Sequence, residues 1–199
     1  MDYIDVDNDS STFNSSMATL DLPDCSTIEY AGLYWAGINP YDTWEDQGTA
    51  NLNIDDVKFR LPGGIYQDIT ADEIIYNDGD VNQRPYVCYK DVTAMVTALG
   101  AAAEGDYFIA DVKATTGYHG SLGSSAGWTM VVIYSDPTET SKNISIFDGF
   151  STIDGTNDAE ITFSGFETIP EGPDPANPAP VRVQLLTCLL YTSPSPRDS

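Results

Sequence analysis

One stretch, residues Gly127–Phe150, limits the possible folds of this chain more than any other. Its first part, Trp128–Tyr134, is an almost unbroken run of apolar and β-branched residues, too short for a comfortable helix. A strand that is apolar on both faces is expected in the middle of a packed β structure, not at its edge. Asp136-Pro137 predicts a turn, and Asn143–Phe150 alternates like a second strand. We therefore expect a β-hairpin on which the rest of the chain packs.

Short strands are predicted wherever apolar residues recur between turn signals. They cover residues 2–7, 18–22, 28–37, 54–61, 65–70, 73–76, 86–90, 107–114, 159–163 and 181–186. The period changes once, where Val92, Met95, Val96 and Leu99 predict one short helix whose N-terminus Asp91 can cap. The sequence thus predicts an all-β protein, a jelly-roll-like sandwich of two packed sheets with about ten strands and one short helix.

Two strands allow their faces to be assigned. Tyr34 and Trp35 should point to opposite faces of the strand at 28–37, because side chains alternate along a strand. In the strand at 107–114, Phe108, Ala110 and Val112 are expected to share one face. The Met and Val stripe of the helix is interpreted as core packing.

The charge balance makes nucleic acids and anionic membrane surfaces unfavourable partners. The 199 residues include 31 acidic and 8 basic ones, a formal net charge of −23, which repels phosphate backbones and anionic membrane surfaces. We therefore expect no nucleic-acid partner. No run approaches the roughly 20 apolar residues of a spanning helix, so no membrane insertion is expected either. The acidity fits a solvated, soluble surface or sites for cations.

Both ends of the sequence look truncated. No signal peptide precedes the first predicted strand, and Met1 runs straight into it. Residues 188–199, CLLYTSPSPRDS, look like the translation of a sequencing-library adaptor. We exclude them from the fold and assign one β-sandwich domain to residues 1–187, a size that can bury a sizeable core.

Without Cys188, two cysteines remain, Cys25 and Cys88. Neither belongs to a CxxC motif and no histidine clusters with them, so a zinc site is not expected. In an exported protein the favoured interpretation is a Cys25–Cys88 disulfide, worth roughly 4 kcal/mol by loop closure. Two buried, inert thiols are the alternative.

Three acidic clusters lie in or beside predicted turns, where free backbone carbonyls can join carboxylates around calcium. They are Asp5, Asp7 and Asp9, then Asp78 and Asp80, then Asp154 and Asp158. The first lacks the Gly and the distal Glu of an EF-hand loop. Calcium is therefore one hypothesis for these clusters, and solvated surface is the other.

Two loops carry candidate ligand-binding residues. Tyr41 and Trp44 lie in a polar loop at residues 39–53, where aromatic rings either stack on a sugar or fold back onto the core. Tyr118 and His119 lie in a Gly- and Ser-rich loop at residues 115–127. His119 has no neighbour in sequence that would orient it as a base, so catalysis by it is not expected.

The chain has no GxGxxG after a strand, no P-loop, no GxSxG and no HExxH motif. Carboxylates are abundant, so a catalytic pair stays open as an alternative, although abundance makes any chosen pair weak support.

Six blocks in order carry a resemblance: STFNSSMATLDLP (11–23), YAGLYWAG (30–37), VKFRLPGG (57–64), PYVCYKDVT (85–93), GWTMVVIY (127–134) and KNISIFDGF (142–150). Together they resemble an N-terminal β domain of large exported bacterial surface proteins of the gliding-motility-associated or type IX secretion type. The resemblance covers nearly all of residues 3–187. It implies export and an extracellular, cell-surface location, and it brings no catalytic residues.

The expected function is a non-catalytic module of an exported cell-surface protein that acts in adhesion or carbohydrate binding. Its partner would be an extracellular glycan or a surface protein. The alternatives are a glycan-active hydrolase that uses a carboxylate pair, and a purely structural spacer.

Overall fold

The structure is a computed structural model, and it describes residues 3–38, 53–77, 85–114, 125–151 and 160–165. The chain divides into two compact units, with the boundary between Thr138 and Glu139. All the described strands belong to the unit before this boundary. The second unit extends to Thr187 and contains no strand in its described residues.

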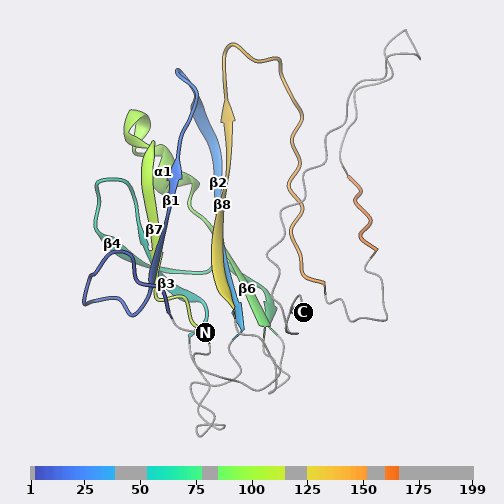
Figure 1. Ribbon diagram of the computed structural model, residues 1–199. Coiled ribbons are helices and arrows are strands. Elements are labelled where there is room, and N and C mark those ends of the chain that lie inside the picture. The colour runs from blue at the N-terminus through green and yellow to red at the C-terminus, as the bar shows by residue number, and fades with distance from the viewer. Residues whose placement is uncertain (1–2, 39–52, 78–84, 115–124, 152–159, 166–199) are drawn as a thin grey trace, which may run out of the picture. The chain divides into compact units, whose positions relative to one another are not determined.

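The described strands form two antiparallel sheets of four (Figure 1). Sheet A has the order β1 (Ser15–Leu20), β7 (Gly105–Ala110), β3 (Asp56–Arg60), β4 (Tyr66–Thr70). Sheet B has the order β5 (Glu73–Asn77), β6 (Pro85–Asp91), β2 (Thr27–Ile38), β8 (Ala126–Ser135). The helix α1 (Thr93–Thr97) and the 3₁₀ turn η1 (Gly100–Ala102) follow β6.

The path of the chain is that of a sandwich. Only β3–β4 and β5–β6 are consecutive strands within one sheet; every other connection between consecutive described strands passes from one sheet to the other. The predicted all-β fold with two packed sheets and one short helix is confirmed. The described part of the chain has eight strands. Residues 3–7, expected to form a strand, lie in a loop instead.

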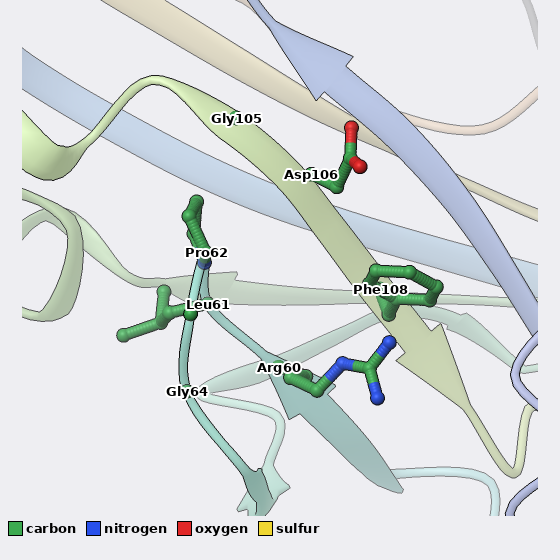
Figure 2. Close-up of a pocket in the computed structure, with 8 residues that line it drawn as sticks. Arg60, Leu61, Pro62, Gly64, Gly105, Asp106 and Phe108 are labelled. Atoms are coloured by element: carbon green, nitrogen blue, oxygen red, sulfur yellow. The ribbon is translucent and has the colours of Figure 1, made fainter.

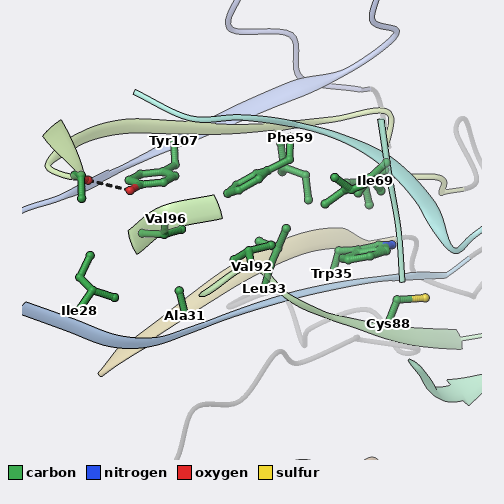
Figure 3. Packing of buried hydrophobic residues seen from close by; sticks show 14 of the residues in the cluster. Ile28, Ala31, Leu33, Trp35, Phe59, Ile69, Cys88, Val92, Val96 and Tyr107 are labelled. Atoms are coloured by element: carbon green, nitrogen blue, oxygen red, sulfur yellow. Dashed lines mark hydrogen bonds between the residues drawn. The ribbon is translucent and has the colours of Figure 1, made fainter. Parts of the chain in front are cut away.

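The core lies between the two sheets (Figure 3). Sheet B contributes Leu33 and Trp35, and sheet A contributes Phe59 and Tyr107, all at most 1% exposed. The rings of Phe59 and Tyr107 stack with centroids 5.9 Å apart. Three polar aromatic side chains enter this core, and each is satisfied: Trp35 Nε1 donates to Ile54 O at 2.9 Å, Tyr86 Oη to Lys113 O at 2.7 Å, and Tyr107 Oη to Ala103 O at 2.7 Å.

Strand β2 is the organising strand, since it pairs with both β6 and β8 and also contacts α1. As predicted, its side chains alternate: Trp35 lies in the core, and Tyr34 lies on the outer face, where its ring centroid is 5.0 Å from that of Tyr89. A Cβ at Gly37 would lie 2.7 Å from Lys113 O, so glycine is required by the close approach of another backbone.

The helix is confirmed as core packing, because Val92 and Val96 are completely buried. It is shorter than predicted, and its N-cap is Val92. Asp91 lies one residue earlier and still accepts a hydrogen bond from the Thr93 amide at 2.8 Å. Thr93 Oγ1 in turn accepts from the Ala31 amide at 3.0 Å, which ties the helix to β2.

The predicted central hairpin is not formed. Strand β8 has the expected residues but lies at an edge of sheet B, beside β2 (Figure 1). Residues 143–150 and 160–163, expected as strands, have no strand structure. Ile144 and Ile146 are 54% and 39% exposed, and the described residues of the two segments belong to no β ladder, which a strand requires. In this second unit the rings of Phe147 and Phe163 contact each other at 5.3 Å.

The predicted Cys25–Cys88 disulfide is also wrong, since both thiols are free. Cys25 is exposed and lies just before the start of β2, whereas Cys88 is buried and pairs with Trp35, far along β2. Trp35 lies eight positions after Thr27 along β2, a rise of roughly 26 Å at about 3.3 Å per residue. A disulfide needs Cα atoms within about 7 Å, so no bond can form.

Candidate functional site

A shallow groove of about 490 Å³ lies on sheet A at the end of β3 and the start of β7 (Figure 2). Its walls combine side chains of three kinds, a cation, a carboxylate and an aromatic ring, with a glycine-rich turn. The lining residues are Arg60, Leu61, Pro62, Gly63, Gly64, Gly105, Asp106 and Phe108. We treat this groove as the candidate site.

The groove exists because β3 and β7 are paired. Arg60 lies directly opposite Phe108 in the register, although the two residues are far apart in the chain. Directly after Arg60 the chain turns through Leu61–Gly64, where Gly63 has φ +68° and the Gly64 amide donates to Leu61 O at 3.0 Å. Gly105 has φ +125°, and a Cβ there would lie 3.2 Å from Pro62 Cβ. Glycine therefore lets this turn approach β7.

Arg60 is the cationic centre of the site. Its guanidinium lies 3.7 Å from the ring centroid of Phe108, which Figure 2 shows beside it, and 4.9 Å from that of Tyr66. Within the described residues it makes no hydrogen bond or ion pair, whereas Lys58 and Lys90 pair with acidic residues at 2.5 and 2.6 Å. The stacking holds the guanidinium plane against aromatic rings. Its forked N–H donors are thus left for a ligand.

A lateral row of side chains continues the groove across the outer face of sheet A. The pairings place Met17, Phe108, Arg60 and Tyr66 next to one another on the four strands. Met17 is 46% exposed, so the row offers apolar surface to solvent beside the guanidinium. Amphipathic rings and a planar donor in one row suit a ligand with both C–H and O–H surface.

Asp106 supplies the acceptor of the groove. It is exposed, and one carboxylate oxygen accepts a hydrogen bond from Thr19 Oγ1 on β1 at 2.7 Å. This bond orients the carboxylate and leaves lone pairs that a ligand hydroxyl can use. Asp106 is the sole acidic residue among those that line the groove, and none of them is a His, Ser or Cys. The arrangement is therefore equipped for binding and lacks the paired groups that hydrolysis uses.

The acidic cluster predicted to bind calcium lies in the loop at residues 3–14. Its three carboxylates accept hydrogen bonds within the protein: Asp5 from Ser15 Oγ at 2.9 Å, Asp7 from the Asp9 amide at 2.8 Å, and Asp9 from the Ser11 amide at 2.9 Å. Asp7 also accepts from the Tyr66 hydroxyl. These carboxylates therefore shape the loop, Asp7 and Asp9 through Asx turns and Asp5 through its bond with Ser15 at the start of β1.

The electrostatics of Asp7 follow from these contacts. Burial alone would raise the pKa of its carboxyl group, but the hydrogen bonds from Tyr66 and the Asp9 amide outweigh burial and hold the pKa below the ordinary 3.8. For Tyr66, burial and then the hydrogen bond to Asp7 raise the pKa well above 10. Tyr66 thus stays a neutral donor that ties the loop to β4.

The other predicted site residues lie outside the described residues. These are Tyr41, Trp44, Asp78, Asp80, Tyr118, His119, Asp154 and Asp158. In the described ranges, no three His, Cys, Asp or Glu side chains form a group that could hold a metal ion. Calcium binding therefore stays a prediction without structural support.

The groove was not predicted from the sequence, although the VKFRLPGG block at residues 57–64 contains Arg60. Lys58 and Arg60 alternate with buried Val57 and Phe59, a pattern that indicates an outward-facing cation. Phe108 was expected to share a face with Val112. Instead Tyr107 and Ile109 face the core, and Asp111, with φ +62°, interrupts the alternation before Val112 becomes buried.

Comparisons with protein-family models, with curated proteins and with solved structures gave no match. The described residues contain no helix long and apolar enough to cross a membrane. The resemblance to exported surface proteins therefore enters the following section as a proposal.

Proposed function

We propose that this protein is a non-catalytic, carbohydrate-binding module of an exported cell-surface protein, and that it binds sugar in the Arg60–Phe108 groove. The observation that carries the proposal is the combination of a stacked guanidinium, an exposed carboxylate and an aromatic ring in one open groove. Protein sites bind sugars through planar polar side chains that meet hydroxyl groups and through apolar rings that meet C–H faces.

The charge of the chain supports a neutral glycan as the ligand. A net charge of −23 opposes the approach of polyanions, and Asp106 adds a local negative charge within the groove. A neutral sugar can accept hydrogen bonds from Arg60 and donate one to Asp106 without bringing in further charge. The shallow form of the groove fits a weak, surface-bound ligand of the kind that adhesion uses through many copies.

The experiment is a glycan screen of the full chain, followed by calorimetric titration with the glycans that bind. We expect Arg60→Ala and Phe108→Leu each to weaken binding at least tenfold. Arg60→Lys should also weaken it, because an ammonium group keeps the charge but loses the planar fork. Gln67→Ala, at an exposed position of β4 that does not line the groove, is the matched control for general damage to sheet A, and all variants are to be compared by thermal melting.

Several outcomes would contradict the proposal. Binding that survives both groove substitutions would exclude the groove, and steady turnover of a glycan would replace the module with the hydrolase. A screen without any bound glycan would leave the spacer as the better account. The surface location has its own test, since added protease should digest the protein on intact cells of its source.

A further inference from the structure

The hydroxyl group of Tyr66 connects the loop at residues 3–14 with the Arg60 groove. Tyr66 is the direct partner of Arg60 in the pairing of β3 with β4, and its ring centroid lies 4.9 Å from the guanidinium. The same residue donates a hydrogen bond to the Asp7 carboxylate. Neither Tyr66 nor Asp7 lines the groove, yet together they reach the cation of the site. The groove therefore has a support that begins in this loop.

Asp7 is itself held in place from two sides. Its Oδ1 accepts a hydrogen bond from the Asp9 amide at 2.8 Å, and its own amide donates to Ser15 Oγ at 3.1 Å. Ser15 begins β1 and is 2% exposed, so the loop is fixed to sheet A. Lys58 on β3 adds a second attachment, because its Nζ donates to Ser11 O at 2.7 Å. The Asp7 carboxylate is thus a fixed acceptor.

A fixed tyrosine ring matters because an arginine side chain has many rotamers, and ordering them when a ligand binds costs affinity. Arg60 has no hydrogen bond or ion pair to a described residue that would order it. The rings of Tyr66 and Phe108 lie within the roughly 6 Å of a cation–π contact, at 4.9 and 3.7 Å from its guanidinium. Since β4 and β7 pair with opposite edges of β3, these two rings flank Arg60 from both sides.

We propose that Asp7 and Tyr66 are positioning residues of the groove, which hold the Arg60 guanidinium in its binding orientation before a ligand arrives. The Asp7 carboxylate orients the Tyr66 ring through the phenol hydroxyl group, and that ring together with Phe108 limits the rotamers of Arg60. Their effect on glycan affinity rests on the proposed function, whereas their effect on the order of the Arg60 side chain does not.

The first measurement is the NMR signal of the Arg60 Nε–H group in the full chain labelled with nitrogen-15, which Arg60→Lys identifies by removing it. Aromatic rings shift the signal of a proton held against their faces, so a positioned guanidinium differs from a mobile one. Tyr66→Phe and Asp7→Ala should each move the signal toward that of a mobile arginine and accelerate exchange of its proton with water. Asp68→Ala is the matched control, because it removes an exposed carboxylate of β4 that makes no hydrogen bond with Tyr66, and it should leave the signal unchanged.

The second measurement is the affinity for a glycan that binds in the screen. We expect Tyr66→Phe and Asp7→Ala each to weaken binding about two- to tenfold, the range that ordering one long side chain costs. In an Arg60→Ala background the same substitutions should weaken binding no further, because they act through the guanidinium. Asp68→Ala should again have no effect.

An Arg60 signal that neither substitution moves would overturn the proposal. So would a glycan that binds in the groove and keeps its affinity for Tyr66→Phe. A signal that moves in a chain that binds no glycan would support the positioning of Arg60 and contradict the proposed function instead. Circular dichroism and melting establish that the variants fold. If Asp7→Ala does not fold, Asp7→Asn keeps the Asx turn and still weakens the acceptor for Tyr66.

Discussion

The indole of Trp128 on β8 donates a hydrogen bond to Ser16 Oγ on β1 at 2.7 Å, and it thereby joins the edge strands of the two sheets. Ser16→Ala should lower the free energy of unfolding by about 1 kcal/mol, because the half-buried indole N–H loses its acceptor. Urea denaturation measures this loss. Ser10→Ala, an exposed serine outside the sandwich, is the control and should have no effect. An unchanged midpoint in Ser16→Ala would mean that water replaces the hydroxyl group at no cost.

Gly105 is the second test, since it determines how closely the Leu61–Gly64 turn approaches β7. Gly105→Ala combines an unfavourable φ of +125° with a Cβ 3.2 Å from Pro62 Cβ, so we expect a loss of about 1–3 kcal/mol. Gly127→Ala is the matched control, because a Cβ at Gly127 meets no atom within 4 Å. Equal melting temperatures for the two variants would contradict this explanation of the groove.

The cysteines give a chemical test. Burial raises the pKa of the Cys88 thiol to about 12, so at about pH 8 this thiol is neutral as well as inaccessible. In a Cys188→Ser chain, a thiol reagent should modify exposed Cys25 in the folded protein and should reach Cys88 only after denaturation. If the denatured, unreduced protein shows no thiol, the two cysteines are bonded and the arrangement described above is wrong.

The hydrogen bond between Tyr66 and Asp7 predicts a pH dependence. Because the folded-state pKa of Asp7 lies below 3.8, its ionised form stabilises the fold above about pH 3.8, and this contribution is lost as the pH falls through the folded pKa. Tyr66→Phe removes a donor to the carboxylate and should raise the pKa of Asp7. Carbon NMR titration of Asp7 measures this shift directly.

The same substitution should change stability in a defined window. Tyr66→Phe should be less stable than the wild type near neutral pH, and the difference should shrink below about pH 3.8 as Asp7 becomes protonated. Tyr134→Phe, at an exposed tyrosine, is the control and should show a constant, small difference. A Tyr66→Phe difference that does not depend on pH would show that the hydroxyl group does not stabilise the ionised form of Asp7.

The sequence predicted which residues form strands and the helix better than it predicted which strands lie side by side. The alternation of Tyr34 and Trp35 and the spacing of Val92 and Val96 each indicate which side chains are buried. Both predictions were confirmed. The predicted position of β8, in the middle of the β structure, was wrong for a physical reason. An apolar pattern records which side chains avoid water, but it does not record which strand lies alongside. The segment at residues 143–150 has the right alternation and still forms no strand.

The candidate site was missed because it depends on register. Arg60 and Phe108 become neighbours only when β7 lies beside β3, and no local pattern contains that pairing. The acidic turns were predicted as calcium sites because their carboxylates lie close together in the sequence. The carboxylates of Asp5, Asp7 and Asp9 instead accept hydrogen bonds that stabilise a loop.

The pairing of β1 with β7 has a consequence for synthesis. Ser15 pairs with Ala110, so sheet A joins segments 95 residues apart in the chain. At about 5–20 residues per second, β1 waits roughly 5–20 s on the ribosome for its partner strand. Non-local pairing of this kind also makes folding itself slow and leaves strands exposed to aggregation. The acidic residues, spread along the whole chain, keep nascent copies apart during this interval by mutual repulsion.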